Sequence, residues 1–302
     1  MNKNKACRDG YGKALVEVGK LNKNVVAITA DLSPSVKMDD FKKKFPTRFF
    51  DVGVAEQNLV TVGSGLAHVG KIPFVSSFGM FCPGRCWEQI RTTIAYNNNN
   101  VKIVSTHCGL NVGQDGATHQ ILEDIAIMRV IPNMTVVVPC DFEQTKKATH
   151  AISKFKGPCY MRVGRSKSRA LTTAKTGFKI GKAQLLKKGK DIAIIGCGPV
   201  LTKAIDAAKK SKKSVRVINM HTIKPLDEKM LTKVAKECKK IITIEDHGVE
   251  GGLGSAVSEF ISEIKPTKII KLGPKNSFGE SGNEKELFEK HGLTVENILK
   301  HL

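Results

Sequence analysis

The stretch Asp51-Val52-Gly53-Val54-Ala55-Glu56-Gln57-Asn58 joins an apolar run to an amphipathic one. The residues before it, Phe49 to Val52, are typical of a strand, and Leu59 to His68 has the spacing of a helix. We therefore expect Glu56 where a strand ends and a helix begins, the position at which open parallel sheets bind ligands. A glutamate in a first helical turn also has a simpler explanation, because the helix macrodipole stabilises it there.

Strand-like and helical stretches alternate on both sides of this segment. The expected strands of the first part of the chain are Val25–Ile28, Phe49–Val52, Ile72–Val75, Val101–Val104, Thr135–Val138 and Tyr160–Val163. Amphipathic stretches such as Trp87–Tyr96 and Phe142–Lys154 lie between them. Several of the strands are apolar at consecutive positions, as burial on both faces requires. The alternation predicts an α/β domain with a doubly wound parallel sheet over residues 1–165.

A second alternating set follows a polar, basic stretch over residues 166–181, which we interpret as a linker. The expected strands of this set are Ile192–Ile195, Val215–Ile218, Ile241–Ile244 and Lys268–Ile270, with helices from Leu201, Asp227, Gly254 and Val295. The 302-residue chain is also too long for one ordinary core. We expect a second, smaller doubly wound α/β domain over residues 182–302.

Composition narrows the classes of protein to which the chain can belong. The formal net charge is +21, but no aromatic residues interleave with the basic runs, so we expect a solvated lysine-rich surface rather than a nucleic-acid interface. No apolar run approaches the ~18 residues of a membrane span, and no apolar segment typical of a secretion signal follows the basic start. The eight cysteines form no zinc-type set and suit the reduced thiols of a cytoplasmic protein.

The residues with useful chemistry share one position, just after an expected strand. They are Asp31, Glu56, Phe78, Phe81, His107, Asp115, His119 and Arg165. Taken singly, each has a structural explanation, such as a turn for Asp115-Gly116 or a core contact for the two phenylalanines. In a parallel sheet, however, all these positions gather at one edge, and together they predict a ligand site.

Several segments resemble the transketolase family in order and at similar spacing. In the first domain they are Thr29–Ser35, Asp51–Asn58, Ser77–Phe81, Ser105–His107 and Gly113–Gln120. In the second domain, Asn219–Leu226 and Glu245–Gly254 are similar to that family's carboxyl-terminal domain. The resemblance covers nearly the whole chain and implies a pyrimidine-binding domain followed by a transketolase-type C-terminal domain.

The resemblance implies thiamine diphosphate as the cofactor and gives four residues to its binding. Glu56 would hydrogen-bond a ring nitrogen of the aminopyrimidine and so act in catalysis as well as in binding. Phe81 would stack on the pyrimidine with Phe78 beside it, and Asp31 would lie close to the cofactor. The implied reaction moves a two-carbon ketol unit from a ketose phosphate to an aldose phosphate.

The same resemblance assigns residues to the sugar phosphates. His107 would bind donor hydroxyls and handle protons, with His119 assisting there as a second catalytic residue. Asp115 would recognise the C2 hydroxyl of the acceptor. The phosphate would be bound by Arg8, Ser35 and Arg165, because a guanidinium fork suits a phosphate.

One family feature is absent from the sequence. The diphosphate and divalent metal of this superfamily are held by a Gly-Asp-Gly motif, and the nearest match here, Gln114-Asp115-Gly116, lacks the first glycine. We therefore assign no metal ligands to this chain, and expect Mg²⁺ or Ca²⁺ to be held by a separate N-terminal, diphosphate-binding subunit. The family expectation for such a split enzyme is a heterotetramer with two copies of each chain.

Three alternatives remain beside a split transketolase. The first is the β-type subunit of a 2-oxoacid dehydrogenase, although the loop Gly113–Gln120 fits transketolase better. The second is a deoxyxylulose-phosphate synthase-like protein, although Thr106-His107 stands where its relatives tend to carry an arginine segment. The third is a noncatalytic anion-binding or regulatory relative, which does not explain why Glu56 and His107 occur together.

Overall fold

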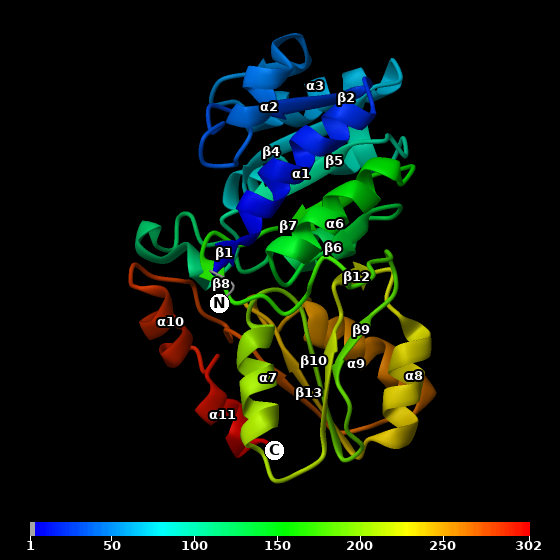
Figure 1. The fold of residues 1–302 in the computed structure, drawn as a ribbon, viewed down its shortest axis with the longest axis vertical. Helices are drawn as coiled ribbons and strands as arrows, with labels where there is room; N and C mark the ends of the chain where they lie inside the picture. Colours follow the sequence, from blue (N-terminus) through cyan, green and yellow to red (C-terminus); the bar gives the residue numbers. More distant parts are fainter. Residues whose placement is uncertain (1–3) are drawn as a thin grey trace.

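The computed structural model describes residues 4–302, which form two parallel-rich sheets, each covered by helices on both faces (Figure 1). The first sheet lies in the upper half of the view, and the second lies below it. This architecture is the α/β class predicted from the alternating sequence pattern, so that prediction is confirmed. Among residues 4–302, no helix combines the length and apolar character that crossing a membrane requires.

The first sheet has seven strands in the order β12-β6-β7-β5-β4-β2-β3. Their bounds are β2 (Val25–Thr29), β3 (Phe49–Asp51), β4 (Ile72–Phe78), β5 (Lys102–Thr106), β6 (Thr135–Val137), β7 (Cys159–Arg162) and β12 (Thr222–Lys224). All neighbouring pairs are parallel except β12 with β6. The strands β2, β5 and β7 are buried along their whole length, as strands covered on both faces must be.

Helices on the two faces of the first sheet bury separate apolar clusters. On one face lie α1 (Cys7–Leu21), α2 (Asp39–Lys44) and α6 (Phe142–Lys154), which bury Tyr11, Phe41 and Ile152 against the sheet. On the other face lie α3 (Glu56–His68), α4 (Trp87–Gln89), η3 (Ile90–Ala95) and α5 (Asp124–Arg129). The short helical segments η1 (Pro46–Arg48), η2 (Met80–Arg85) and η4 (Leu110–Asp115) lie between these elements.

The second sheet has five strands in the order β14-β13-β10-β11-β9. Their bounds are β9 (Gln184–Lys187), β10 (Ile192–Gly196), β11 (Val215–Asn219), β13 (Lys240–Ile244) and β14 (Ile269–Leu272), and only β9 is antiparallel. One apolar cluster includes α7 (Leu201–Lys210), α10 (Glu284–Lys290) and α11 (Val295–Lys300). The other includes α8 (Glu228–Glu237) and α9 (Leu253–Ile264).

The two halves of the chain are joined more closely than the sequence pattern suggested. Strand β12 comes from the second half, yet it pairs with β6 at the end of the first sheet. One apolar cluster continues from Leu59 of α3 through Ile223 of β12 to Leu253 of α9. In addition, β8 (Lys167–Ser168), within the expected linker, pairs antiparallel with β1 (Lys5–Ala6). The sequence analysis missed β1, β8, β9 and β12, because short strands without an apolar run carry little signal.

Candidate active site

The predicted site residues follow strands that are neighbours in the first sheet. Strands β3, β2, β4, β5 and β7 lie side by side and run parallel, so their carboxyl ends share one edge. Glu56 follows β3, Phe78 ends β4, His107 follows β5 and Arg165 follows β7. The sheet topology therefore supplies the convergence that the sequence pattern predicted.

Glu56 is a buried carboxylate at the first position of α3. Gly53, with φ of 71°, allows the chain to turn sharply from β3 toward this helix. The side chain of Glu56 is 2% exposed, and its Oε2 accepts a hydrogen bond of 2.7 Å from Nη1 of Arg85. The Arg85 side chain is 51% exposed, so a buried carboxylate is paired here with a cation from the surface.

Two phenylalanines and two histidines form an aromatic wall beside Glu56. The rings of Phe78 and His107 stack with their centroids 3.7 Å apart, and Phe78 and Phe81 are 6.0 Å apart and nearly parallel. The His119 ring meets the Phe81 ring edge-on at 5.3 Å. The Arg85 guanidinium lies 5.0 Å from the Phe81 ring centre, so Arg85 connects the aromatic wall to Glu56.

His107 is held as a neutral ring with a defined tautomer. Nη1 of Arg8 lies 3.4 Å from its Nε2, and a guanidinium can only donate, so Nε2 is the acceptor. The ring proton is then on Nδ1, which lies 2.9 Å from Oγ1 of Thr106. Burial lowers the pKa of His107 to about 3, with the nearby Arg8 and Arg165 contributing in the same direction.

Arg165 and Asp115 lie at the other end of the cluster. The Arg165 guanidinium donates to the carbonyl of Val112 and lies 3.8 Å from the carboxylate of Asp115. Both side chains are more than a third exposed, so this pair faces the solvent. The side chain of Asn111 accepts a 2.7 Å hydrogen bond from the backbone N–H of Arg165. The loop with Asp115 and the end of β7 are therefore tied together.

Ser35 and Asp31 differ in how they join the cluster. The carbonyl of Ser35 accepts a 3.1 Å hydrogen bond from Nη1 of Arg8, which links the loop after β2 to His107. Asp31 is exposed, and its backbone N–H donates to Oδ1 of Asp51. Among residues 4–302, no hydrogen bond or ion pair joins the Asp31 side chain to the other predicted site residues.

Sequence reasoning missed Arg85 and Asn111, which contact the predicted residues. Arg85 follows Phe81 by four residues, and a cation beside an aromatic residue is a weak sign of a site without the three-dimensional contact. Asn111, like His107, comes after the strand β5, but in the sequence it looks like an ordinary loop residue. Contacts between segments far apart in the sequence reveal both roles.

The residues at this edge fit the aminopyrimidine end of thiamine diphosphate. The fit rests on a buried carboxylate, Glu56, joined through Arg85 to the partly exposed ring of Phe81, because such a pair suits a flat, hydrogen-bonding heterocycle. Among residues 4–302, no group of three or more His, Cys, Asp or Glu side chains is arranged to hold a metal ion.

The fold and this cluster place the protein in the class of α/β proteins that bind a ligand at the carboxyl edge of a parallel sheet. A family model described as the transketolase pyrimidine-binding domain matches residues 3–170, and one described as the transketolase C-terminal domain matches residues 181–298. The chain belongs to the transketolase family, a family of transferases that depend on thiamine diphosphate.

Individual relatives are similar to the chain over nearly its whole length. A putative transketolase C-terminal section of Methanocaldococcus jannaschii is 45% identical over 99% of this chain and 95% of its own length. One subunit of an apulose-4-phosphate transketolase from Phocaeicola vulgatus is 38% identical over 98% of this chain and 96% of its own length. In contrast, the chain spans 48% of human transketolase, at 35% identity.

A solved structure agrees with the fold in detail. It is described as a split gene transketolase, inactive beta4 tetramer, and is 42% identical to this chain. The two superpose with a TM-score of 0.90 over 99% of this chain and 97% of the other.

Proposed function

We propose that the chain is the C-terminal subunit of a two-chain transketolase that moves a two-carbon ketol unit from a ketose phosphate to an aldose phosphate. The observation that carries this proposal is the contact chain from buried Glu56 through Arg85 and Phe81 to His119. It brings a proton-sharing carboxylate, an aromatic wall and an imidazole to one edge of the sheet. The similarity to a transketolase C-terminal section and to one subunit of an apulose-4-phosphate transketolase supports a separate partner.

At the cofactor end, Glu56 would hold the aminopyrimidine by a hydrogen bond and share a proton with it, and Phe81 would supply an aromatic face for the ring. Phe78 supports Phe81 from behind, since their rings lie nearly parallel. Asp31 is exposed on the loop after β2, and we assign it a position beside the cofactor. When bound, thiamine diphosphate supplies a nucleophilic carbon and an electron sink for breaking a carbon–carbon bond.

At the substrate end, the neutral His107 binds a donor hydroxyl and can pass a proton at Nε2, and His119 assists across the aromatic wall. Asp115 binds the C2 hydroxyl of the acceptor. Arg8 and Arg165 bind the sugar phosphate, and both cations lie close enough to His107 to lower its pKa. Ser35 holds Arg8 through its carbonyl and contributes to the same phosphate site.

The other half of the site belongs to a diphosphate-binding N-terminal subunit. We propose that this partner holds the diphosphate and its Mg²⁺ or Ca²⁺, and that two copies of each chain assemble into a heterotetramer. A related structure is described as an inactive beta4 tetramer, which supports the expectation that this chain alone is inactive.

The test is a two-carbon transfer assay with xylulose 5-phosphate and ribose 5-phosphate in the presence of thiamine diphosphate and Mg²⁺. It compares the chain alone, the chain with its diphosphate-binding partner, and the same mixture with Glu56→Gln. We expect activity in the wild-type mixture only, and a loss of at least about a hundredfold with Glu56→Gln, because proton sharing with the ring nitrogen is removed.

Glu228→Gln is the matched control, since Glu228 is also a first-turn glutamate but lies exposed on α8. It should keep the wild-type rate. Equal losses of activity in Glu56→Gln and Glu228→Gln would show that a negative charge in a first helical turn matters, rather than the position of Glu56 in the site. An inactive mixture, despite a complex verified by sedimentation, would refute transfer between these sugars. A parallel arm with apulose 4-phosphate would then show whether the sugar named for the Phocaeicola vulgatus relative is used instead.

A further inference from the structure

The loop with Asp115 and His119 is fixed at both ends by one short segment of the C-terminal domain. This segment, Asp246-His247-Gly248, follows β13 and is mostly buried. It contacts the loop at its start, near Leu110, and at its end, near Leu122 and Ile125. A domain without a predicted site residue therefore determines where two predicted site residues lie.

The carboxylate of Asp246 caps the start of η4. Its Oδ1 accepts a 2.8 Å hydrogen bond from the backbone N–H of Leu110, and its Oδ2 accepts from the backbone N–H of Asn111 at 3.4 Å. Oδ2 also accepts from Nδ2 of Asn111 at 2.8 Å. The side chain is 6% exposed, so these bonds are shielded from water and each is of the stronger, charge-assisted kind.

Gly109 lies where the carboxylate of Asp246 approaches the backbone of the loop. A Cβ placed on Gly109 would lie within van der Waals overlap of Oδ2 of Asp246, so any larger residue would displace the carboxylate. Gly109 also has φ of 87°, a conformation that residues with a side chain rarely adopt. This close approach means that the cap depends on a specific backbone arrangement.

Asn111 passes the constraint from Asp246 to Arg165. Its Nδ2 donates to Asp246, and its Oδ1 accepts from the backbone N–H groups of Arg165 at 2.7 Å and Ser166 at 3.4 Å. The orientation of the Asn111 amide is therefore determined, because one side faces an acceptor and the other faces donors. The guanidinium of Arg165 in turn contacts η4, because it donates to the carbonyl of Val112 and lies 3.8 Å from the carboxylate of Asp115.

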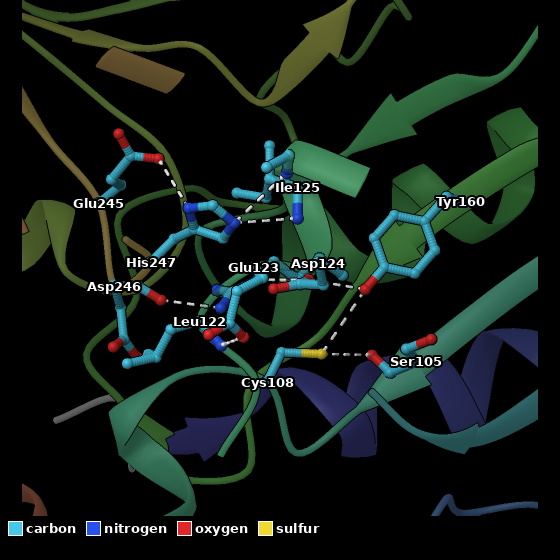
Figure 2. Close-up of polar contacts among 12 residues, drawn as sticks. Ser105, Cys108, Leu122, Glu123, Asp124, Ile125, Tyr160, Glu245, Asp246 and His247 are labelled. Atoms are coloured by element: carbon cyan, nitrogen blue, oxygen red, sulfur yellow. Dashed lines mark hydrogen bonds and ion pairs between the residues drawn. The ribbon is translucent and has the colours of Figure 1, made fainter. Parts of the chain in front are cut away.

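The far end of the loop has its own contacts with the segment. The backbone N–H of Gly248 donates to the carbonyl of Leu122 at 2.8 Å, and Nε2 of His247 accepts from the backbone N–H of Ile125 at 3.1 Å. Figure 2 shows His247 between Glu245 and the start of α5, with Asp124 directed toward the hydroxyl of Tyr160.

From these contacts we infer that Asp246 is a positioning residue that holds Arg165 and Asp115 in their substrate-binding geometry through Asn111. The inference rests on the proposed function for its substrates, sugar phosphates, but the positioning itself is a property of the chain. The Asp246 carboxylate is buried and contacts Leu110 and Asn111, so its loss should weaken recognition of the sugar phosphate more than it slows the transfer step.

The test variant is Asp246→Asn, which keeps the shape of the side chain but replaces one acceptor oxygen with an amide donor. In the assembled two-chain enzyme we expect KM for the sugar phosphates to rise about tenfold while kcat changes by less than about threefold. In the chain alone, hydrogen exchange measured on peptides over residues 108–116 should show faster exchange at Leu110 and Asn111.

Asp227→Asn is the matched control, because Asp227 is also a buried C-terminal-domain carboxylate that accepts from backbone N–H groups, those of Ala183 and Met230. It should leave KM and the exchange of residues 108–116 unchanged. Asn111→Ser is a second variant, which removes the amide that joins the Asp246 carboxylate to the backbone of Arg165 and leaves Asp246 in place. It should reproduce the KM increase, and it keeps the test available if Asp246→Asn does not fold.

Unchanged exchange at Leu110 and Asn111, or an unchanged KM in both variants, would overturn the inference. A fall in kcat alone would overturn it as well, because that pattern belongs to a group acting in the transfer step. Since exchange is measured without substrate, a wild-type enzyme inactive on these sugars would refute the proposed function and still leave the positioning decided by the exchange data.

Discussion

The two ends of the site are built in opposite ways. At the proposed cofactor end, the buried carboxylate of Glu56 is paired with the half-exposed Arg85, and the neighbouring Val54 and Phe50 are 74% and 39% exposed. At the proposed substrate end, the loop from Cys108 to Ile125 is tied into a buried network that reaches the C-terminal domain. The first end is open, with a surface cation as the partner of Glu56, whereas the second is anchored from beneath by buried contacts, although Asp115 and Arg165 on its surface are also exposed.

This difference shows which interactions the chain completes by itself. The loop at the proposed substrate end is held by contacts among residues of this chain, which is how binding groups are preorganised. The open end exposes apolar side chains next to a buried charge, an arrangement expected where a further surface covers the site. Measurements of stability can test this contrast.

The largest effect should come from breaking the buried ion pair under the loop. Oδ2 of Asp124 accepts 2.7 Å hydrogen bonds from Nε of Arg162 and from the hydroxyl of Tyr160, and all three side chains are buried. We expect Asp124→Ala to lower the free energy of unfolding by about 3–5 kcal/mol, because it leaves a guanidinium buried without its partner. Urea denaturation followed by circular dichroism measures this loss.

Asp206→Ala is the comparison for that experiment, because it breaks the exposed ion pair with Arg169. It should cost less than about 1 kcal/mol. Similar losses from the two variants would remove the distinction between an anchored loop and an ordinary surface.

An intermediate effect should appear as a dependence on pH. Burial is the main cause that lowers the pKa of His247 to about 4. Asp124 raises this pKa slightly and Arg162 lowers it, and Oε2 of Glu245 lies 3.7 Å from Nδ1 of His247. The neutral ring stabilises the fold fully above the unfolded pKa of about 6.5, and this contribution is lost as the pH falls toward 4. Between about pH 6.5 and 4, the free energy of unfolding of the wild type should therefore fall by roughly 1–3 kcal/mol more than that of His247→Gln.

Glu245 contributes with the opposite sign over nearly the same pH range. Burial raises the pKa of Glu245 to about 7, so its contribution is complete below the unfolded pKa of about 4.5 and is lost as the pH rises through 7. Comparison with His247→Gln, in which Glu245 is kept, is therefore needed to separate the two groups. Parallel profiles for the wild type and His247→Gln between about pH 6.5 and 4 would contradict the assignment of acid sensitivity to His247.

The smallest effect should come from the open end. Arg85→Met removes the cation paired with Glu56 but keeps an apolar side chain of similar length, and the Arg85 side chain is half exposed. We expect the free energy of unfolding to fall by about 1–2 kcal/mol, because Glu56 is buried and loses its partner while the Arg85 side chain itself is half exposed. Thermal melts of the chain alone provide the measurement, and a loss above about 2 kcal/mol would show that the open end is anchored after all.

The sequence predicted much of the fold because buried parallel strands have a strong apolar signal. The expected strands from Val25–Ile28 to Lys268–Ile270 all correspond to strands in the structure. Positions after those strands then indicated where Glu56 and His107 would gather, since topology brings strand ends together. The position of β12 lacked such a signal, because Thr222–Lys224 has three residues and pairs across the two halves of the chain.

The contacts that hold the site in place were beyond what sequence patterns indicate. Arg85, Asn111 and Asp246 act through partners that are 29 to 136 residues away in the chain. The stretch Glu245–Gly254 was notable only as a resemblance, with no chemistry of its own. Hydrogen bonding of a loop by a distant carboxylate depends on three-dimensional approach, which Gly109 permits because a Cβ there would overlap the carboxylate of Asp246.

The pairing of β12 with β6 also has a consequence for how this protein can be divided or recombined. A fragment ending before residue 166 would retain β6 but lose the strand that covers its outer side, together with the Lys224 ammonium that binds the carbonyls of Arg129 and Ile131. Such a fragment would present a bare row of backbone donors and acceptors, a template for aggregation. The two halves thus share one sheet and one apolar cluster, so separating them breaks both, although the sequence reads as two modules.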